Sequence, residues 1–274
     1  MVDNKEYKVL ARKYRPQKFS DLIGQDILVQ ILTNAIITNR IANAYLLTGV
    51  RGVGKTTTAR LIAMSLNCES KNTKSCEPCG NCASCNSIRS DHNLDVIEMD
   101  AASKTGVDDV REIIDNVKYK PVNCEYKIFI IDEVHMLSKS AFNALLKTLE
   151  EPPDHVKFIF ATTEVKKIPI TILSRCQRFD LKRVDSNNLG KHLKKISELE
   201  KIKIDNDAIA LLVRAGDGSV RDSLSLLDQA IIKNEETISA ETVTNMLGYA
   251  DRGKIYDLVK NITKGDASTS DLYR

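Results

Sequence analysis

The octapeptide GVRGVGKT, at residues 49–56, combines residue types and spacing that bind the phosphates of a nucleotide. It satisfies the pattern G-x4-G-K-[ST], with the strand-like run AYLLT before it and the helix-like run TTTARLIAMSL after it. Glycines let backbone N–H groups surround the phosphates, and the start of a helix adds a favourable dipole. Lys55 is expected to reach the β and γ phosphates, and the Thr56 hydroxyl is expected to hold Mg²⁺.

The alternative for this octapeptide is a glycine-rich turn without chemistry, and the flanking strand and helix patterns disfavour it. We therefore predict a nucleotide-binding loop. Its predicted binding residues are Gly49, Val50, Arg51, Gly52, Val53, Gly54, Lys55, Thr56 and Thr57.

Two carboxylates, Asp132 and Glu133, end the strongly apolar run in IFIIDEVH. A buried strand that ends this way can aim its first carboxylate at a metal ion and its second at the water that attacks a γ-phosphate. We assign Asp132 to the magnesium ion, together with Thr56, and Glu133 to the role of catalytic base. An acidic helix cap is the alternative, and it is weaker in a chain that also carries Lys55. His135 is interpreted as a packing or capping residue.

Three later residues become relevant only beside this predicted site. Arg175 lies in ILSRC, Arg221 follows the turn GDGS at the head of a helix-like run, and Thr163 ends the run FIFATT. Judged from their spacing alone, Arg175 and Arg221 are typical of ordinary surface arginines. For Thr163 two interpretations stay open: it senses the γ-phosphate, or it is a polar cap at the end of a strand.

Five of the seven cysteines lie in the stretch CESKNTKSCEPCGNCASC, residues 68–85. Thiolates in C-x2-C turns are typical ligands of tetrahedral Zn²⁺, which takes four, so five cysteines offer one more than is needed. A purely local interpretation selects the four evenly spaced residues, Cys76, Cys79, Cys82 and Cys85. An iron–sulfur cluster is disfavoured because the ending C-x3-C-P is missing. Unliganded redox cysteines are a further alternative.

Composition limits the class of protein. A chain of 274 residues that is 42% hydrophobic can bury a sizeable core. It has no uninterrupted apolar run of ~20 residues, and its polar start lacks the apolar stretch of a secretory signal, so we expect a cytoplasmic protein without a membrane partner. The net charge of +3 is too small to indicate nucleic-acid binding, which would need a local patch.

Strand-like and helix-like runs alternate from residue 44 to about 180, which predicts an α/β fold with a parallel sheet covered by helices. From about 182 to 248 only helical spacing remains, which predicts a small all-α domain. The tail from Asp251 reads as one more helix followed by a polar run. We interpret the chain as a fragment or an early-terminating product.

The motifs TGVRGVGKTTTARLIAMSLNCE, IIDEVHMLSKSAFNALLKTLEEPP, ATTEVKKIPITILSRC and GSVRDSLSLLDQA together resemble the gamma/tau subunits of the bacterial DNA polymerase III clamp loader, which are AAA+ ATPases. The N-terminal VLARKYRPQKFSDLIGQ is similar as well, so the resemblance runs from about residue 9 to residue 248. It implies an AAA+ P-loop ATPase domain over residues 1–181, a helical lid domain over 182–248, and the start of a truncated collar domain over 249–274.

The resemblance also assigns roles to the candidate residues. Lys55 and Thr56 correspond to the Walker A pair, and Asp132 and Glu133 correspond to Walker B. Sensor 1 is Thr163 and sensor 2 is Arg221. The arginine finger, which reaches a neighbouring subunit's nucleotide in trans, is Arg175, so an isolated chain is expected to be a poor ATPase. The segment expected near the adenine contains Arg12, Arg15 and Pro16.

For the cysteines, the resemblance implies a zinc-binding insertion over about residues 68–90. One ligand comes from the LNCE segment and three from PCGNCASC, which leaves Cys76 spare. The metal would be structural and would take no part in hydrolysis. The implied zinc ligands are Cys68, Cys79, Cys82 and Cys85.

The function that the resemblance implies is an ATP-dependent motor, with ATP, Mg²⁺ and Zn²⁺ as its cofactors, that loads a sliding clamp onto primer-template DNA. Its implied partners are the delta and delta-prime subunits, further gamma/tau copies, the clamp and DNA; the polymerase core and helicase would bind only through a C-terminal region absent here. Such subunits are grouped with DNA-directed DNA polymerase, a nucleotidyltransferase, but no polymerase site is visible in this sequence. The alternatives are another AAA+ machine, such as a branch-migration motor, and a scaffold that does not hydrolyse ATP.

Overall fold

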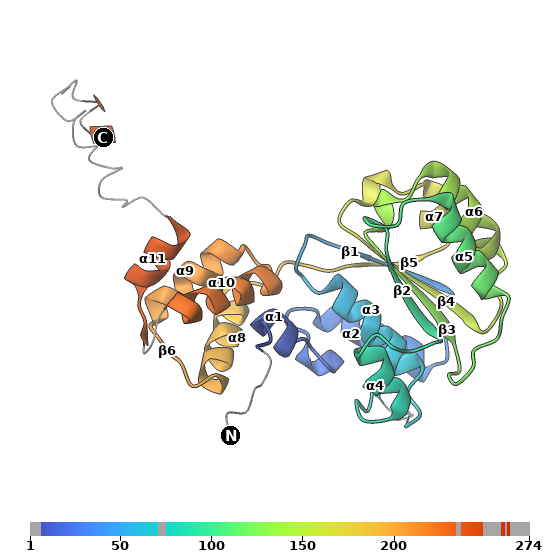
Figure 1. The fold of residues 1–274 in the computed structure, drawn as a ribbon, viewed down its shortest axis with the longest axis horizontal. Coiled ribbons are helices and arrows are strands. Elements are labelled where there is room, and N and C mark those ends of the chain that lie inside the picture. Colours follow the sequence, from blue (N-terminus) through green and yellow to red (C-terminus); the bar gives the residue numbers. More distant parts are fainter. Residues whose placement is uncertain (1–6, 71–74, 234–236, 249–258, 261, 264–274) are drawn as a thin grey trace.

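The computed structural model describes residues 7–70, 75–233, 237–248, 259–260 and 262–263. Within them the chain forms an α/β domain and a smaller helical domain, which lie side by side with helix α1 (Leu10–Lys13) between them (Figure 1). This confirms the predicted fold class. The tail helix predicted from Asp251 and the collar predicted over 249–274 fall almost wholly outside the described residues.

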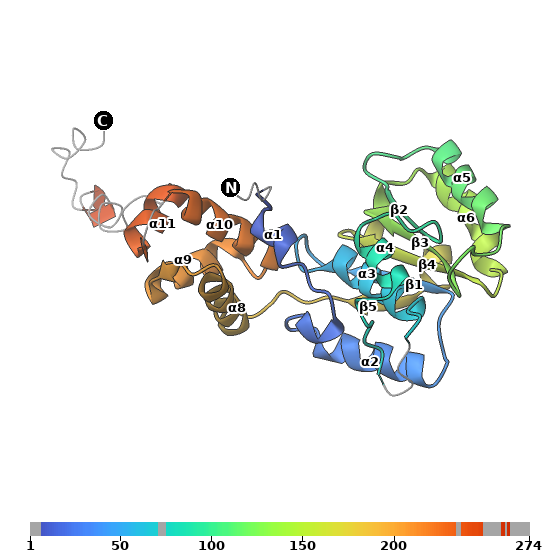
Figure 2. The same cartoon turned by 60° about the horizontal axis from the view of Figure 1, so that its bottom comes forward.

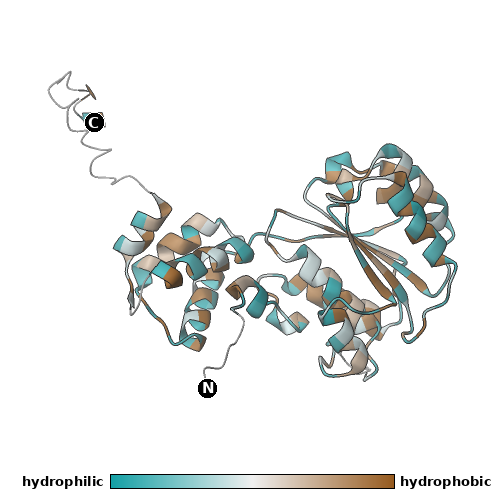
Figure 3. Cartoon of the chain, in the orientation of Figure 1, coloured by the Kyte–Doolittle hydropathy of each residue, from teal (hydrophilic) through white to brown (hydrophobic). Residues whose placement is uncertain are grey.

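The α/β domain is built on a five-stranded sheet in the order β2-β3-β4-β1-β5, with every neighbouring pair parallel. Four of its strands coincide with the predicted apolar runs, and Figure 3 shows hydrophobic colour along the strands of the sheet. The short edge strand β5 was not predicted, because only one of its four residues is buried. The strands are β1 (Ala44–Thr48), β2 (Val96–Asp100), β3 (Lys127–Asp132), β4 (Val156–Thr162) and β5 (Gln177–Asp180).

Helices cover both faces of this sheet, as Figures 1 and 2 show from two directions. Alternate strand residues point to opposite faces, so Tyr45 and Leu47 pack into one core while Ala44 and Leu46 pack into the other. The first face carries α2 (Asp26–Ile37), α3 (Lys55–Leu66) and α4 (Ala83–Arg89). The second carries α5 (Val107–Val117), α6 (Lys139–Glu150) and α7 (Ile170–Leu173). Three short 3-10 turns are η1 (Phe19–Asp21), η2 (Val134–Met136) and η3 (Val165–Lys167).

The helical domain begins where the alternating pattern ends. Two of its helices start at side chains that cap them, since Asp185 accepts a hydrogen bond from the Asn188 N–H at 2.9 Å and Ser239 accepts one from the Thr242 N–H at 3.3 Å. The helices are α8 (Ser186–Leu199), α9 (Asn206–Gly216), α10 (Val220–Lys233) and α11 (Ala240–Leu247), with a two-stranded ladder of β6 (Lys203–Ile204) and β7 (Thr237–Ile238). No helix in the described part of the chain is long and apolar enough to cross a membrane.

The N-terminal residues pack on the helical domain, although they precede the α/β domain in the sequence. Leu10 is buried in the helical domain's core. The Tyr7 hydroxyl donates to Asp228 of α10 at 2.6 Å, and the Tyr14 hydroxyl donates to Glu200 at 2.6 Å. The chain therefore crosses between the domains twice, once near Arg15 and once after β5.

A buried carboxylate holds the loop that leads into β3. Asp95 is 1% exposed, and its two carboxylate oxygens accept backbone N–H groups of Val122 and Asn123 at 2.7 Å and of Cys124 at 2.9 Å. Hydrogen bonds to a charged acceptor are among the stronger ones in proteins. Since β2 and β3 are neighbours, this cluster fixes how both strands enter the sheet.

We predict that Asp95→Ala lowers the free energy of unfolding by about 3 kcal/mol, because three backbone donors lose a charged acceptor. Urea denaturation followed by circular dichroism measures this change. The control is Asp108→Ala on α5, whose carboxylate is 93% exposed and should cost under about 0.5 kcal/mol. Equal effects of the two substitutions would contradict the prediction.

Candidate functional site

The predicted phosphate loop lies between β1 and α3, at the carboxyl edge of the sheet. The Lys55 side chain is 5% exposed, and its ammonium donates to the carbonyls of Gly49 at 3.0 Å and Val50 at 3.1 Å. Burial lowers the pKa of Lys55, while the carboxylates of Glu133 and Asp132 oppose that effect. The lysine is therefore folded back over its own loop, next to both acidic residues.

The structure brings together Thr56 and Asp132, the two residues that the sequence analysis assigned to the magnesium ion. The Thr56 hydroxyl donates to the Asp132 carboxylate, and the other oxygen of that carboxylate accepts the Glu133 N–H at 2.9 Å. A hydroxyl and a carboxylate in contact at the start of a phosphate-binding helix match the oxygen ligands that Mg²⁺ takes in such sites. The donor set present at this position therefore fits magnesium.

Glu133 is held by the end of the neighbouring strand. One of its carboxylate oxygens accepts both the Thr163 N–H at 3.2 Å and the Thr163 hydroxyl at 3.0 Å. Glu133 also has a left-handed backbone, with φ of 45°, a conformation that residues with side chains adopt rarely and that concentrates at functional sites. Strand β4 ends at Thr162, one residue earlier than predicted, so Thr163 is free to turn toward Glu133.

His135 belongs to this site as well, although the sequence analysis interpreted it as a packing or capping residue. Its side chain is 6% exposed, and its Nδ1 lies 3.0 Å from the Thr162 hydroxyl and 3.4 Å from the carboxylate of Glu133. Its Nε2 lies 3.4 Å from Glu164. The signal in the sequence was its position two residues after Glu133, within the turn η2.

The helical domain contacts the phosphate loop through the start of α10. The Arg221 N–H donates to the Gly52 carbonyl at 3.3 Å. Gly52 has φ of 78°, and a Cβ atom built there would lie 1.9 Å from the Ser219 hydroxyl, so only glycine fits. The structure therefore places Arg221 beside the phosphate loop, and its side chain is exposed.

Arg15 lies in a cluster of cations near the loop. Burial lowers the pKa of Arg15, and the positive charges of Arg60, Arg221 and Arg12 lower it further, while Glu98 opposes them. Arg60, which the sequence analysis did not single out, forms a bidentate pair with Glu98 at 2.6 and 2.8 Å. Glu98 offsets only part of this positive charge, and several cations that act on one another are typical of a site for a polyanion. Pro16 follows and is half-buried.

Among the residues predicted to act on ATP, Arg175 bonds to α6 and α7 and not to the phosphate loop. It follows α7 and is exposed, and its guanidinium donates to the Thr171 carbonyl at 2.6 Å and to Glu150 of α6 at 2.6 Å. Among the described residues its hydrogen bonds go to α6 and α7, and none reaches the phosphate loop. Its side chain is thus accessible from outside the chain.

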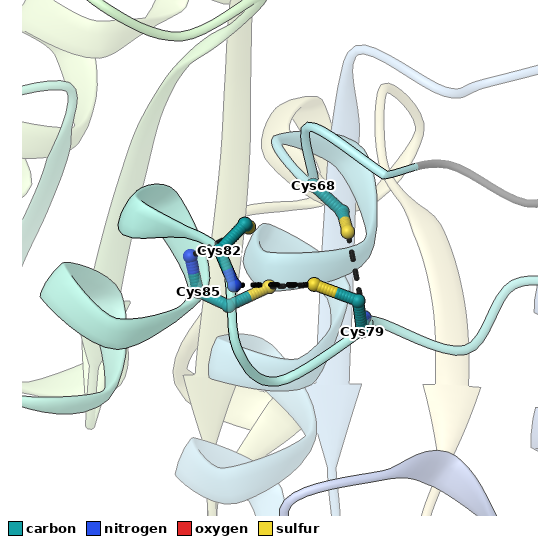
Figure 4. A group of neighbouring side chains, drawn as sticks. All are labelled: Cys68, Cys79, Cys82 and Cys85. Carbon is teal, nitrogen blue, oxygen red and sulfur yellow. Dashed lines mark hydrogen bonds between the residues drawn. The ribbon is translucent and has the colours of Figure 1, made fainter.

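Four of the five clustered cysteines converge (Figure 4). Their sulfur atoms all lie within 4.8 Å of one another, and the sulfurs of Cys79 and Cys85 are 4.0 Å apart. A tetrahedral site with zinc–sulfur bonds of about 2.3 Å needs sulfur atoms roughly 3.8 Å apart, so this donor set fits Zn²⁺. The four residues are Cys68, Cys79, Cys82 and Cys85.

Backbone donors favour a thiolate at one of these positions. The N–H groups of Asn81 and Cys82 point at the Cys79 sulfur at 3.4 and 3.3 Å, and they lower the pKa of Cys79 to about 6. Burial raises the pKa of Cys68 and of Cys85 instead. A cation bound among the four sulfurs would offset that burial cost.

Cys76 points away from this group. Its sulfur lies 2.8 Å from the hydroxyl of Thr33 on α2, and its carbonyl accepts the hydroxyl of Ser65 on α3. The structure therefore groups Cys68 with the three later cysteines, and the evenly spaced set is not the one that converges. The cluster lies beyond the end of the 12-residue helix α3, about 18 Å along its axis from the phosphate loop.

Known families match most of the chain. The family described as DNA polymerase III, delta subunit, matches residues 24–185, and the DNA polymerase III clamp loader subunit ATPase lid domain matches residues 188–243. DNA polymerase III subunits gamma and tau domain III matches residues 238–270.

Curated relatives carry the same names. The chain is 48% identical over 260 residues to DNA polymerase III subunit tau/gamma of Haemophilus influenzae, and 48% identical over 260 residues to subunit tau of Escherichia coli. These matches cover 95% of this chain but only 38% and 40% of the two relatives. Subunit gamma of Buchnera aphidicola from Acyrthosiphon pisum is 45% identical, and the match covers 97% of this chain and 73% of that protein.

Among solved structures, the Holliday junction branch migration motor RuvB of Thermotoga maritima is similar in fold. Its TM-score is 0.61 with 18% identity, over 86% of this chain and 72% of that one. At this identity the likeness shows the AAA+ P-loop fold alone. The family follows from the sequence matches: the gamma subunit of Buchnera, at 45% identity over 73% of its length, and the matches to the clamp loader lid domain and to gamma and tau domain III show that the chain belongs to the gamma/tau subunit family of the DNA polymerase III clamp loader.

Proposed function

We propose that this chain is an ATP-hydrolysing motor subunit that helps to load a sliding clamp onto primer-template DNA. The observation that carries the proposal is the acidic pair at the end of β3. Asp132 contacts the Thr56 hydroxyl, and Glu133 is held by Thr163, the residue that follows the adjoining strand β4. Both carboxylates act on the ammonium of Lys55. A loop that only bound nucleotide would need no second carboxylate held in this way.

In this mechanism Lys55 leaves the carbonyls of Gly49 and Val50 and turns to the β and γ phosphates of ATP. Thr56 and Asp132 would hold Mg²⁺, which neutralises charge on the phosphates when it is bound. Glu133 accepts a proton from the attacking water. Thr163 orients the Glu133 carboxylate, and His135 packs against the same carboxylate oxygen.

Two arginines would complete the site from different directions. Arg221 lies at the phosphate loop and would contact the γ-phosphate from the lid domain of the same chain. Arg175 is exposed and distant from its own loop, as a finger that acts on a neighbouring subunit's ATP would be. An arginine finger is worth on the order of a thousandfold or more in rate.

The partners follow from the family and remain part of this proposal. They are the delta and delta-prime subunits, further gamma/tau copies, the sliding clamp and primer-template DNA. DNA contacts would go mainly to phosphates, and clamp loading would therefore weaken as salt rises.

The four converging cysteines would hold Zn²⁺ as a structural ion. Four thiolates fill its coordination sphere, so no position is left open for catalysis. The loop that carries them is poor in apolar residues, and the metal would supply the folding energy that a core supplies elsewhere.

Glu133→Gln should reduce ATP turnover by about 100-fold or more while ATP still binds, because a general base is worth 10²–10⁴ in rate. Steady-state hydrolysis is measured in the assembled loader with clamp and primed DNA, and ATP binding is measured by calorimetry. Glu112→Gln, on the exposed face of α5, is the matched control. If the wild type is inactive in a loader shown to be assembled, a non-hydrolysing scaffold replaces the motor.

Arg175→Ala should lower the rate of ATP hydrolysis by about a thousandfold in the assembled loader. It should leave the rate of the isolated chain unchanged, because the finger acts in trans. The same hydrolysis assay with and without the partner subunits measures this. Arg111→Ala removes an exposed arginine that also pairs with an acidic neighbour and is the control. A loss of turnover in the isolated chain would refute the assignment.

Cys79→Ser should leave the chain without stoichiometric zinc and lower the midpoint of thermal unfolding by ~5 °C or more. Cys76→Ser should keep one zinc ion per chain, because its sulfur contacts Thr33 and not the cluster. Metal content is read by mass spectrometry. If Cys76→Ser loses its zinc while Cys68→Ser keeps it, the zinc ligands are the evenly spaced cysteines, with Cys76 in place of Cys68.

A further inference from the structure

The N-terminal segment, residues 7–21, is fastened at two places. Its first part is held on the helical domain, where Tyr14 and Lys13 both reach the carboxylate of Glu200 at 2.6 Å. Its last part is held in the α/β domain, where Phe19 is 1% exposed and packs in the same core as Cys68, Cys76 and Cys85. The few residues between these anchors, including Arg15 and Pro16, span the two domains.

The second anchor includes a side chain of the cysteine-rich loop. The Glu77 carboxylate accepts the backbone N–H of Phe19 at 2.8 Å with one oxygen and that of Ser20 at 2.8 Å with the other. Glu77 is itself fixed on both sides, because Cys76 contacts α2 and α3 and Cys79 belongs to the converging four. The cysteine-rich loop therefore grips the N-terminal segment through one half-buried carboxylate.

This grip is close to the cation cluster. The Gln17 side chain donates to the Arg15 carbonyl at 2.8 Å, and the Gln17 N–H and Lys18 N–H point at Asp21 at 3.3 and 3.2 Å. A chain of short contacts thus runs from Glu77 through the turn η1 to Arg15. The positive charges of Arg60 and Arg221 act on Arg15, and the Arg221 N–H donates to the Gly52 carbonyl of the phosphate loop at 3.3 Å.

We propose that Glu77 is a positioning residue for nucleotide binding: it holds the segment that carries Arg15 in the place where ATP needs it. The inference rests on the proposed function, since it assumes that the cation cluster binds ATP. It gives the cysteine-rich loop a role at the nucleotide site despite the length of α3 between them. The loop acts through the N-terminal segment and makes no contact with ATP.

The size of the effect follows from populations. If the segment is docked for only a tenth of the time without Glu77, the apparent dissociation constant for ATP rises about tenfold. Glu77→Ala removes both hydrogen bonds and should approach that value. Glu77→Gln keeps one carbonyl acceptor and should give about a threefold change.

The test is calorimetric titration of ATPγS into the isolated chain for the wild type, Glu77→Ala, Glu77→Gln and Arg15→Ala, and for the double variant Glu77→Ala with Arg15→Ala. Because Glu77 acts through Arg15, the double variant should bind no more weakly than Arg15→Ala alone. Hydrogen exchange at Phe19 and Ser20 should speed up in Glu77→Ala, while zinc content stays at one per chain.

The matched control is Glu69→Gln. Glu69 lies in the same cysteine-rich loop and also accepts two hydrogen bonds, from the N–H and the hydroxyl of Ser84 at 3.0 Å, but it does not touch the N-terminal segment. It should bind ATPγS like the wild type. Wild-type affinity in Glu77→Ala, or strictly additive losses in the double variant, would overturn the inference. Failure of the wild type to bind ATPγS would overturn the proposed function and this inference with it.

Discussion

The parallel pairing of β1, β4 and β3 is the constraint on which the rest of the site depends. Because all strands run the same way, their carboxyl ends meet at one edge of the sheet, where Thr48 pairs with Thr162 and Ile131 with Phe160. Parallel pairing is therefore enough to make the residues that follow those strands neighbours. Glu133 reaches Thr163 for this reason alone.

Helix α3 joins two different chemistries. Nine of its 12 residues are buried, so it is fixed against the sheet along its length. Its first residue, Lys55, faces the acidic pair, and just beyond its other end Cys68 enters the cysteine cluster. A rigid helix of 12 residues therefore separates the two sites.

The helical domain contacts the α/β domain at a few closely packed residues, among them Gly52 and Ser219. Gly52 admits no side chain against Ser219, which places the start of α10 directly on the phosphate loop. Helix α1 packs on the helical domain through Leu10, although it precedes the α/β domain in the sequence. The helical domain is therefore in contact both with the phosphate loop and with the N-terminal segment that leads to Arg15.

The sequence by itself determined the fold class, four of the five strands of the parallel sheet, the phosphate loop and the acidic pair, because each depends on local spacing and on the alternation of strands and helices. It also suggested the family, which the comparisons bear out. Only the tertiary structure decided that His135 joins the site and that Arg60 acts on Arg15. For the cysteines, local spacing alone favoured Cys76, and the structure brings together the set with Cys68 that the family resemblance implied. These outcomes depend on contacts between side chains that are far apart in the sequence, across the sheet and around α3. Local residue spacing does not encode such contacts.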